Sequence, residues 1–96
     1  MNVDLSKPIL DVNDQPFVDE NKEPVIAKAI IVKALSLGQD DIKDFFKKCE
    51  VYDLYKKVKT HAIMDLTKSE VATIQDSVGK VFGVLICGQI NGMLKE

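Results

Sequence analysis

Pairs of hydrophobic residues recur at a fixed interval in the first quarter of the chain. Pro8, Pro16 and Pro24 stand eight residues apart, and each is followed by two apolar residues. Polar stretches that contain Asp and Asn separate the copies, and these side chains bond to nearby backbone and tolerate left-handed dihedral angles. The pattern predicts short extended pieces joined by tight turns, so we expect a turn-rich hairpin segment over residues 1–24.

Two strands of this hairpin are expected at residues 9–12 and 16–19, with the turn near residues 13–14. Proline cannot donate a backbone hydrogen bond, so Pro16 is expected at a strand start or a sheet edge. The Asp-x-Asn-x spacing also opens calcium-binding loops, but such a loop requires glycine at its sixth position. Both copies have proline there. We therefore interpret the spacing as turn chemistry.

A nearly continuous apolar run extends from residue 25 to residue 37, and its few polar residues share one narrow side at helical spacing. This pattern indicates a helix that is buried on most of its circumference. We expect Gly38 to end the helix, because glycine commonly follows the last turn. Whether Val25 begins a strand or this helix stays open, because a proline is compatible with the start of either element.

A second helix is predicted after residues 40–41, because apolar residues again recur at steps of three and four. Asp40 or Asp41 is expected to cap its start, where an acidic side chain complements the positive end of the helix dipole. A shift in the phase of the pattern near residues 50–51 allows a break there. The stripe that we expect to face the core consists of Ile42, Phe45, Phe46, Cys49 and Tyr52.

Thr67 and Glu70 have the spacing of a capping box, in which each side chain bonds to the backbone of the other residue. We therefore expect a third helix to begin at Lys68. The pairing of a hydroxyl residue with a glutamate three positions later is a specific signal, because it satisfies two backbone donors that a helix start leaves unpaired.

Glycines punctuate the very apolar end of the chain. An interior glycine costs a helix about 1 kcal/mol relative to alanine, so several glycines in one tail indicate a break or a close helix contact. We expect a break or kink near Gly83 and a last helix from Val84 to Lys95; one kinked helix and two separate helices both fit the pattern. The glycines concerned are Gly79, Gly83, Gly88 and Gly92.

These elements together predict one domain over residues 1–96 of the mainly α (α+β) class. An N-terminal β-hairpin over residues 1–24 packs on a bundle of three to four helices over residues 25–96. A chain of this length has room for a single hydrophobic core. The apolar content of 46% and the charged content of 29% are typical of a folded globular protein.

No motif predicts catalysis, and we expect neither a cofactor nor a bound metal. His61 is the only histidine and has no nucleophile or acid partner in a recognisable pattern. Cys49 and Cys87 fall in apolar helical surroundings, which is typical of free, buried thiols. We therefore predict that the protein is not an enzyme.

The chain is expected to be cytoplasmic and to make no membrane contact. Its first residues lack a basic region followed by an apolar run, so no signal peptide is expected. The apolar stretches are interrupted by lysine or glycine and are shorter than a membrane span. Two free thiols suit a reducing compartment.

The C-terminal tail is the predicted partner surface. A helix that is apolar on more than one side requires more cover than a small domain can supply, so we expect it to dock on another protein. A second copy of the chain, in a homodimer or a higher oligomer, is the expected partner. The residues concerned are Val84, Leu85, Gly88, Ile90, Gly92 and Met93.

A nucleic-acid partner is the alternative hypothesis. The predicted second helix carries many lysines, and Lys43, Lys47, Lys56 and Lys57 could contact phosphates. Three observations argue against this reading. The net charge is −2, acidic residues interrupt the lysine face, and all thirteen basic residues are lysine. Arginine, which clamps phosphates and guanine edges with two parallel bonds, is absent.

Both ends of the chain resemble a group of short, largely uncharacterised bacteriophage and prophage proteins. The resemblance is carried by residues 4–11, by the turn at 13–16, and by residues 78–82 and 88–89. It implies a small virus-encoded accessory or assembly factor in the cytoplasm of an infected bacterium. These motifs are turns and packing residues, so the resemblance assigns no catalytic or binding residue.

Overall fold

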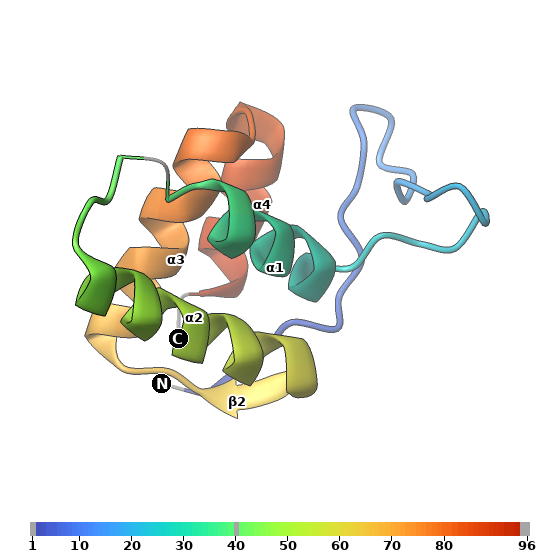
Figure 1. Ribbon diagram of the computed structural model, residues 1–96. Coiled ribbons are helices and arrows are strands. Elements are labelled where there is room, and N and C mark those ends of the chain that lie inside the picture. The colour runs from blue at the N-terminus through green and yellow to red at the C-terminus, as the bar shows by residue number, and fades with distance from the viewer. Residues whose placement is uncertain (1, 40, 95–96) are drawn as a thin grey trace.

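The computed structural model describes residues 2–39 and 41–94, which contain four helices and two short strands (Figure 1). The predicted fold class, mainly α with a small β part, is confirmed. The elements in chain order are β1 (Asn2–Asp4), α1 (Ala27–Leu37), α2 (Phe45–Thr60), β2 (Ile63–Asp65), α3 (Lys68–Val81) and α4 (Val84–Met93).

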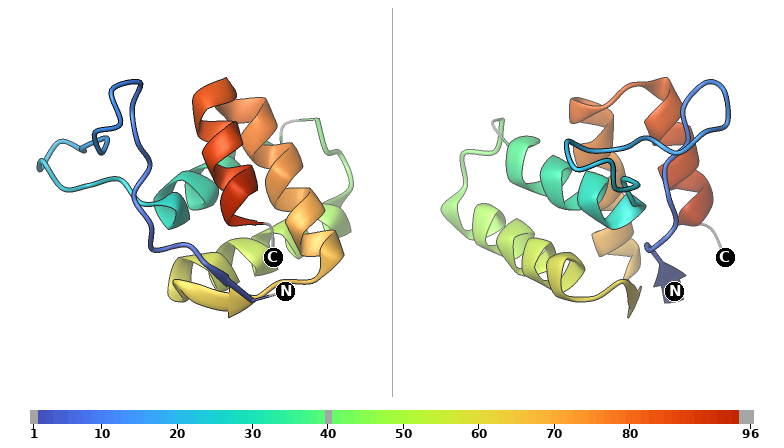
Figure 2. Two further views of the ribbon diagram at one scale, coloured as in Figure 1. Left: turned by 180° about the vertical axis from the view of Figure 1, so that it is seen from behind. Right: turned by 90° about the vertical axis from the view of Figure 1, so that its right-hand side faces the viewer.

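Helix α1 is the central element of the bundle and packs against both α2 and α3. Its sequence explains this position, because a helix that is apolar on most sides must be covered by several neighbours. Ile31 and Ala34 of α1 are completely buried. Helix α4 packs along α3 and contributes Ile90 to the same core (Figure 2). The buried side chains of the helices and strands form one continuous apolar cluster.

The small sheet joins two segments that are far apart in the sequence. Strands β1 and β2 are antiparallel, with Val3 opposite Met64. Both of these side chains are buried, whereas Asn2, Ile63 and Asp65 beside them are exposed. This alternation is typical of a sheet with one face on the core. The pair could not be predicted from the sequence, because three residues are too few to establish a period of two.

The proline repeats form a compact lobe, and we refer to residues 7–27 as the proline lobe. The turn expected near residues 13–14 is present, and one isolated antiparallel bridge joins the first two repeats across it, but residues 9–12 and 16–19 do not form the two predicted strands. The third repeat joins them, so that each piece meets the next in a cycle. The antiparallel bridges are Leu10 with Pro16, Val18 with Pro24, and Ile26 with Pro8.

Backbone hydrogen bonds close the proline lobe into a ring. The N–H of Phe17 donates to the carbonyl of Ile9, that of Val25 to Phe17, and that of Ile9 to Val25, at 2.8–2.9 Å. Equivalent residues of the three repeats therefore satisfy one another's backbone groups. The N–H of Ala27 donates to the carbonyl of Lys7 at 2.9 Å, so the chain leaves the lobe where it entered. The eight-residue interval is the period of this threefold arrangement.

The two turns of the proline lobe use the same side-chain bonds. The carboxylate of Asp11 accepts from the backbone N–H groups two and four residues later, and Asp19 does the same. Three residues after each aspartate, Asp14 and Lys22 have positive φ angles of 59° and 61°. Short polar residues such as aspartate tolerate this conformation better than lysine does. The interpretation of these stretches as turns is thus confirmed.

Gln89 of α4 holds the proline lobe against the bundle. Its amide Nε2 donates to the carbonyl of Leu10, and its Oε1 accepts from the N–H of Leu10, both at 2.8 Å. One side chain thus satisfies both backbone groups of Leu10, as a neighbouring strand would. Ile9, next to it, is completely buried in the core. The rest of the lobe projects from the side of the bundle (Figure 1).

Helix α1 begins at Ala27, so Val25 belongs to the third extended repeat and the question left open by the sequence is resolved. Gly38 ends α1 as predicted. Its φ is −84°, which any residue can adopt, so the left-handed conformation is not the reason for glycine here. The position is instead crowded by the backbones of α1 and α3.

The predicted cap of α2 was placed too early. Asp44 is the N-cap residue, and its carboxylate accepts from the N–H groups of Phe46 and Lys47. Asp41 binds Lys80 of α3 instead, at 2.9 Å, and Asp40 lies outside the described residues. Several aspartates precede the helix, and sequence alone does not show which of them has the extended backbone that a cap requires.

The capping box at the start of α3 is present as predicted. The Thr67 hydroxyl accepts from the N–H of Glu70, and the Glu70 carboxylate accepts from the N–H of Thr67. Helices α3 and α4 are separate, because α3 ends at Val81 and α4 begins at Val84 after an extended residue at Gly83. The expected break near Gly83 therefore separates two helices. Lys95 lies outside the described residues.

Candidate functional site

The apolar stripe of α2 that the sequence assigned to the core lies on the outside of the protein. Phe45, Phe46 and Tyr52 are 70%, 76% and 56% exposed, and Cys49 is exposed between them. Only Ile42, before the helix, packs partly against the core. The core-facing residues of α2 are the shifted set of Val51, Leu54 and Val58. The predicted direction of the stripe was wrong, although its periodicity was read correctly.

The geometry of the helix explains how both sets can be apolar. Residues seven positions apart differ in direction by only about 20°, so Phe45 and Tyr52 point the same way. Tyr52 and Val58 are six positions apart and point more than about 100° from one another. Helix α2 therefore has an inner apolar side towards α1 and the core and an outer apolar side towards solvent. We refer to Phe45, Phe46, Cys49, Tyr52 and Lys56 as the α2 outer face.

Aromatic rings and lysine side chains lie beside one another on the α2 outer face and next to it. The rings of Phe45 and Phe46 meet edge to face with centroids 5.6 Å apart. The Lys56 ammonium lies 5.2 Å from the centroid of Tyr52, and that of Lys59 lies 5.5 Å from the centroid of Tyr55. An ammonium at this distance is attracted to the electron-rich face of the ring. The surface is therefore apolar and positively charged at once.

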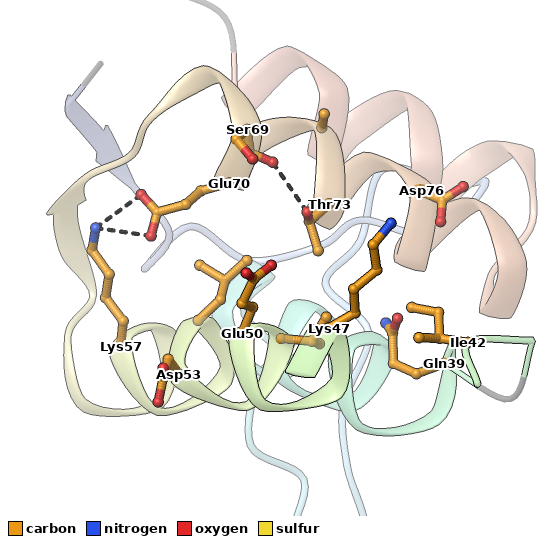
Figure 3. Close-up of a pocket in the computed structure, with 13 residues that line it drawn as sticks. Gln39, Ile42, Lys47, Glu50, Asp53, Lys57, Ser69, Glu70, Thr73 and Asp76 are labelled. Atoms are coloured by element: carbon orange, nitrogen blue, oxygen red, sulfur yellow. Dashed lines mark hydrogen bonds and ion pairs between the residues drawn. The ribbon is translucent and has the colours of Figure 1, made fainter. Parts of the chain in front are cut away.

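A groove of about 590 Å³ lies on the other side of α2, between α2 and α3 (Figure 3). Charged side chains of both signs line it, and Lys47 and Lys57 extend into it from α2. The Lys57 ammonium bridges to the Glu70 carboxylate at 3.1 Å. Glu70 also belongs to the capping box. The ion pair therefore ties the last turn of α2 to the start of α3, which is a structural role.

The pH dependence of stability should reveal this role. Partial burial raises the pKa of Glu70, but the bonds from the Thr67 N–H and the Lys57 ammonium outweigh it and hold the pKa below its ordinary value of 4.5. The folded state therefore favours ionised Glu70, and this stabilisation is complete above pH 4.5. It is lost as the pH falls through the lower pKa of the folded state.

We expect Glu70→Gln to lower the free energy of unfolding by about 1 kcal/mol at neutral pH, because glutamine keeps an acceptor for Thr67 but loses the charge. The difference from the parent should shrink as the pH is lowered below 4.5. Urea unfolding at a series of pH values measures it. Glu50→Gln, on an exposed carboxylate of the same groove, is the control and should change stability by less than about 0.5 kcal/mol. A difference that stays constant with pH would contradict the assignment.

The predicted C-terminal partner surface is divided between core and solvent. Ile90 is 1% exposed and Met93 is partly buried, so both pack within their own fold. Val84 and Leu85 are 92% and 41% exposed at the start of α4. Gly88 and Gly92 are exposed, and a Cβ atom added at either would meet nothing within 4 Å. These glycines therefore do not serve close packing among the described residues of the chain.

The four lysines of the nucleic-acid hypothesis do not gather on one face. Lys47 and Lys56 are nine positions apart on α2, which turns them about 180° from one another. Lys57 is paired with Glu70 in the groove, and Lys43 precedes the helix. A phosphate backbone on one side of α2 could therefore reach only some of them.

The remaining chemical groups show ordinary structural contacts. His61 is exposed, and its Nδ1 lies 2.9 Å from the Thr60 hydroxyl. The Cys87 thiol approaches the backbone carbonyls of Val78 and Phe82. Across residues 2–39 and 41–94, His, Cys, Asp and Glu side chains form no group of three or more that could hold a metal ion. No helix in this part of the chain is both long and apolar enough to cross a membrane.

Comparison with known proteins does not assign a function to the chain, so a function has to be inferred from the structure. No protein-family model, curated protein or solved structure matches the chain significantly.

Proposed function

We propose that the protein is a non-enzymatic accessory or assembly protein that binds another protein through the α2 outer face. The observation that carries the proposal is the exposure of Phe45, Phe46 and Tyr52 on one side of a helix whose opposite side supplies the core. Burying a phenylalanine side chain is worth about 1.5–3 kcal/mol, so this exposure is unfavourable in the free protein. A partner that covers the rings recovers that energy.

The composition of the face fits a protein partner. Aromatic residues that cluster at the centre of a patch supply most of the binding energy in protein interfaces, and charged residues at the rim supply orientation. The α2 outer face has this arrangement, with aromatic rings beside Lys56 and near Lys48 and Lys59. A second copy of the chain is the partner that we propose first. The resemblance to phage proteins suggests that the process is an assembly or accessory step in the bacterial cytoplasm.

The nucleic-acid alternative is supported less well. The lysines selected for it point in different directions around α2, and Lys57 is neutralised by Glu70. The aromatic face could stack on bases, but the overall charge of −2 would oppose the approach of a polyanion.

A capture experiment with matched variants tests the proposed function. The purified chain is immobilised, incubated with bacterial cytosol that also contains untagged chain, and the bound proteins are quantified by mass spectrometry. Phe45→Ser with Phe46→Ser should reduce the specifically captured protein at least about tenfold, because it removes two aromatic anchors worth about 1 kcal/mol or more each. Both rings are exposed, so stability should change little.

Two further variants make the result specific. Ile63→Ser, on an exposed residue of β2, is the matched control and should leave capture unchanged. Val84→Ser tests the C-terminal surface, and a larger loss from this variant than from the double variant would transfer the function to α4. Equal capture by the parent and the Phe45→Ser/Phe46→Ser variant would refute the α2 outer face as the binding site.

A further inference from the structure

The exposed part of the proline lobe is strongly acidic. Residues 11–24 carry five carboxylates and one lysine. The lobe also exposes apolar side chains between these charges, with Val12 81%, Val18 58% and Phe17 38% exposed. The lobe is therefore a projecting surface that is apolar and negative.

Helix α2 has the opposite charge. It carries five lysines and two acidic residues, and the α2 outer face adds exposed aromatic rings. Of the lysines, Lys57 is paired with Glu70, whereas Lys48 and Lys56 are exposed and are not in a salt bridge within the described residues. One projecting acidic and apolar surface and one basic and aromatic surface are thus present in the same chain.

The two surfaces lie apart within one copy. The proline lobe projects from one side of the bundle, and α2 begins at the opposite side (Figures 1 and 2). The longest extent of the protein is 40 Å, and both the front and the back view place the bundle between the lobe and the start of α2. A contact between these complementary surfaces must therefore join different copies.

We propose that the proline lobe of one copy docks on the α2 outer face of the next copy. This inference rests on the proposed function, because it names the partner of the α2 outer face. Glu20 and Glu23 of the lobe would face lysines such as Lys48 and Lys56, while the apolar lobe residues cover the aromatic rings. Opposite charges on two surfaces accelerate their encounter and set their orientation, and the apolar contacts supply affinity.

The contact is head to tail, because each copy contributes a different surface to it. Such a heterologous contact leaves a free lobe at one end of a pair and a free α2 outer face at the other. Association therefore continues beyond the dimer until a ring closes or a filament forms. Salt should weaken it, because the charges lie on exposed surfaces.

A charge-swap experiment tests the proposal. The first variant is Glu20→Lys with Glu23→Lys, which makes the lobe basic at two exposed positions that cap neither turn. The second is Lys48→Glu with Lys56→Glu, which places acidic residues on the α2 outer face and beside it. Each variant alone should associate more weakly than the parent, because positions 20 and 23 then carry the same sign of charge as positions 48 and 56. An equimolar mixture should associate like the parent, because each variant complements the other.

Light scattering at low salt over a range of concentrations measures these species, and circular dichroism verifies that each variant is folded. The parent mass should rise above 10.7 kDa with concentration, and its association constant should exceed that of either variant alone at least about tenfold. Undiminished association of Glu20→Lys/Glu23→Lys alone would overturn the proposal in favour of a contact without the lobe, and a mixture that does not recover would also overturn it. A monomeric parent overturns it too, whereas the proposed function is judged separately by the capture experiment.

Discussion

Replacing Gly38 with alanine is expected to lower the free energy of unfolding by about 2–3 kcal/mol. A Cβ atom at this position would lie 2.8 Å from the carbonyl oxygen of Ala34 and 3.1 Å from that of Ser77. Both are backbone atoms, so no side-chain rotation can relieve the contact. The last turn of α1 would have to shift to relieve the first contact, and α1 and α3 would have to separate to relieve the second. Urea unfolding monitored by circular dichroism measures the loss.

The other glycines provide controls with the opposite sign. Gly79 lies in α3 and Gly88 in α4, and a Cβ atom at either position would meet nothing within 4 Å. Alanine at these exposed helical positions should raise the free energy of unfolding by about 0.5–1 kcal/mol, because it restricts the unfolded chain without a clash. If Gly38→Ala also stabilised the protein, the close approach of α1 and α3 at Gly38 would be refuted.

Replacing Gln89 with alanine is expected to lower the free energy of unfolding by about 2 kcal/mol, because it removes two hydrogen bonds and leaves both backbone groups of Leu10 unsatisfied in a partly buried place. The loss should be concentrated in the proline lobe, because Gln89 bonds to Leu10 of that lobe. Hydrogen exchange should therefore accelerate at the ring amides of Ile9, Phe17 and Val25 more than in α3.

Gln75→Ala is the matched control for this experiment. Gln75 also uses its side-chain amide in a contact with α4, to Asn91 at 3.3 Å, but that contact is exposed and joins two side chains. Its removal should change stability by less than about 0.5 kcal/mol. If the two glutamine variants had equal effects on exchange in the proline lobe, Gln89 would not be its attachment.

Local signals in the sequence predicted the features that depend on a few neighbouring residues. The capping box of Thr67 and Glu70, the turns after Asp11 and Asp19, and the break at Gly83 all follow from residues within five positions of one another. Their physical causes are local hydrogen bonds and backbone preferences, which act before any tertiary contact. The coarse fold class follows from the sum of such signals.

Features set by tertiary contacts were not accessible in the same way. Periodicity showed that α2 has apolar residues at helical spacing, but it does not show which of two apolar sides other elements cover. Gln89 meets Leu10 across 79 positions, and no local pattern indicates a glutamine that acts as a strand. Phe45, Phe46 and Tyr52 were therefore assigned to the core from the sequence and not to a binding site. Their exposure became visible only in the fold, where Val51, Leu54 and Val58 supply the core-facing side of α2.

The bond between Lys7 and Ala27 has a consequence for how this chain can vary. Because entry and exit are adjacent, the course of the bundle does not depend on the exposed turns of the lobe, which lie beyond the buried Ile9 and the bonded Leu10. Substitutions in the exposed turns can then change the charge and the hydrophobicity of the proline lobe without disturbing the packing of the helices. The choice of binding partner could thus change through the sequence of the lobe, while the helical bundle stays the same.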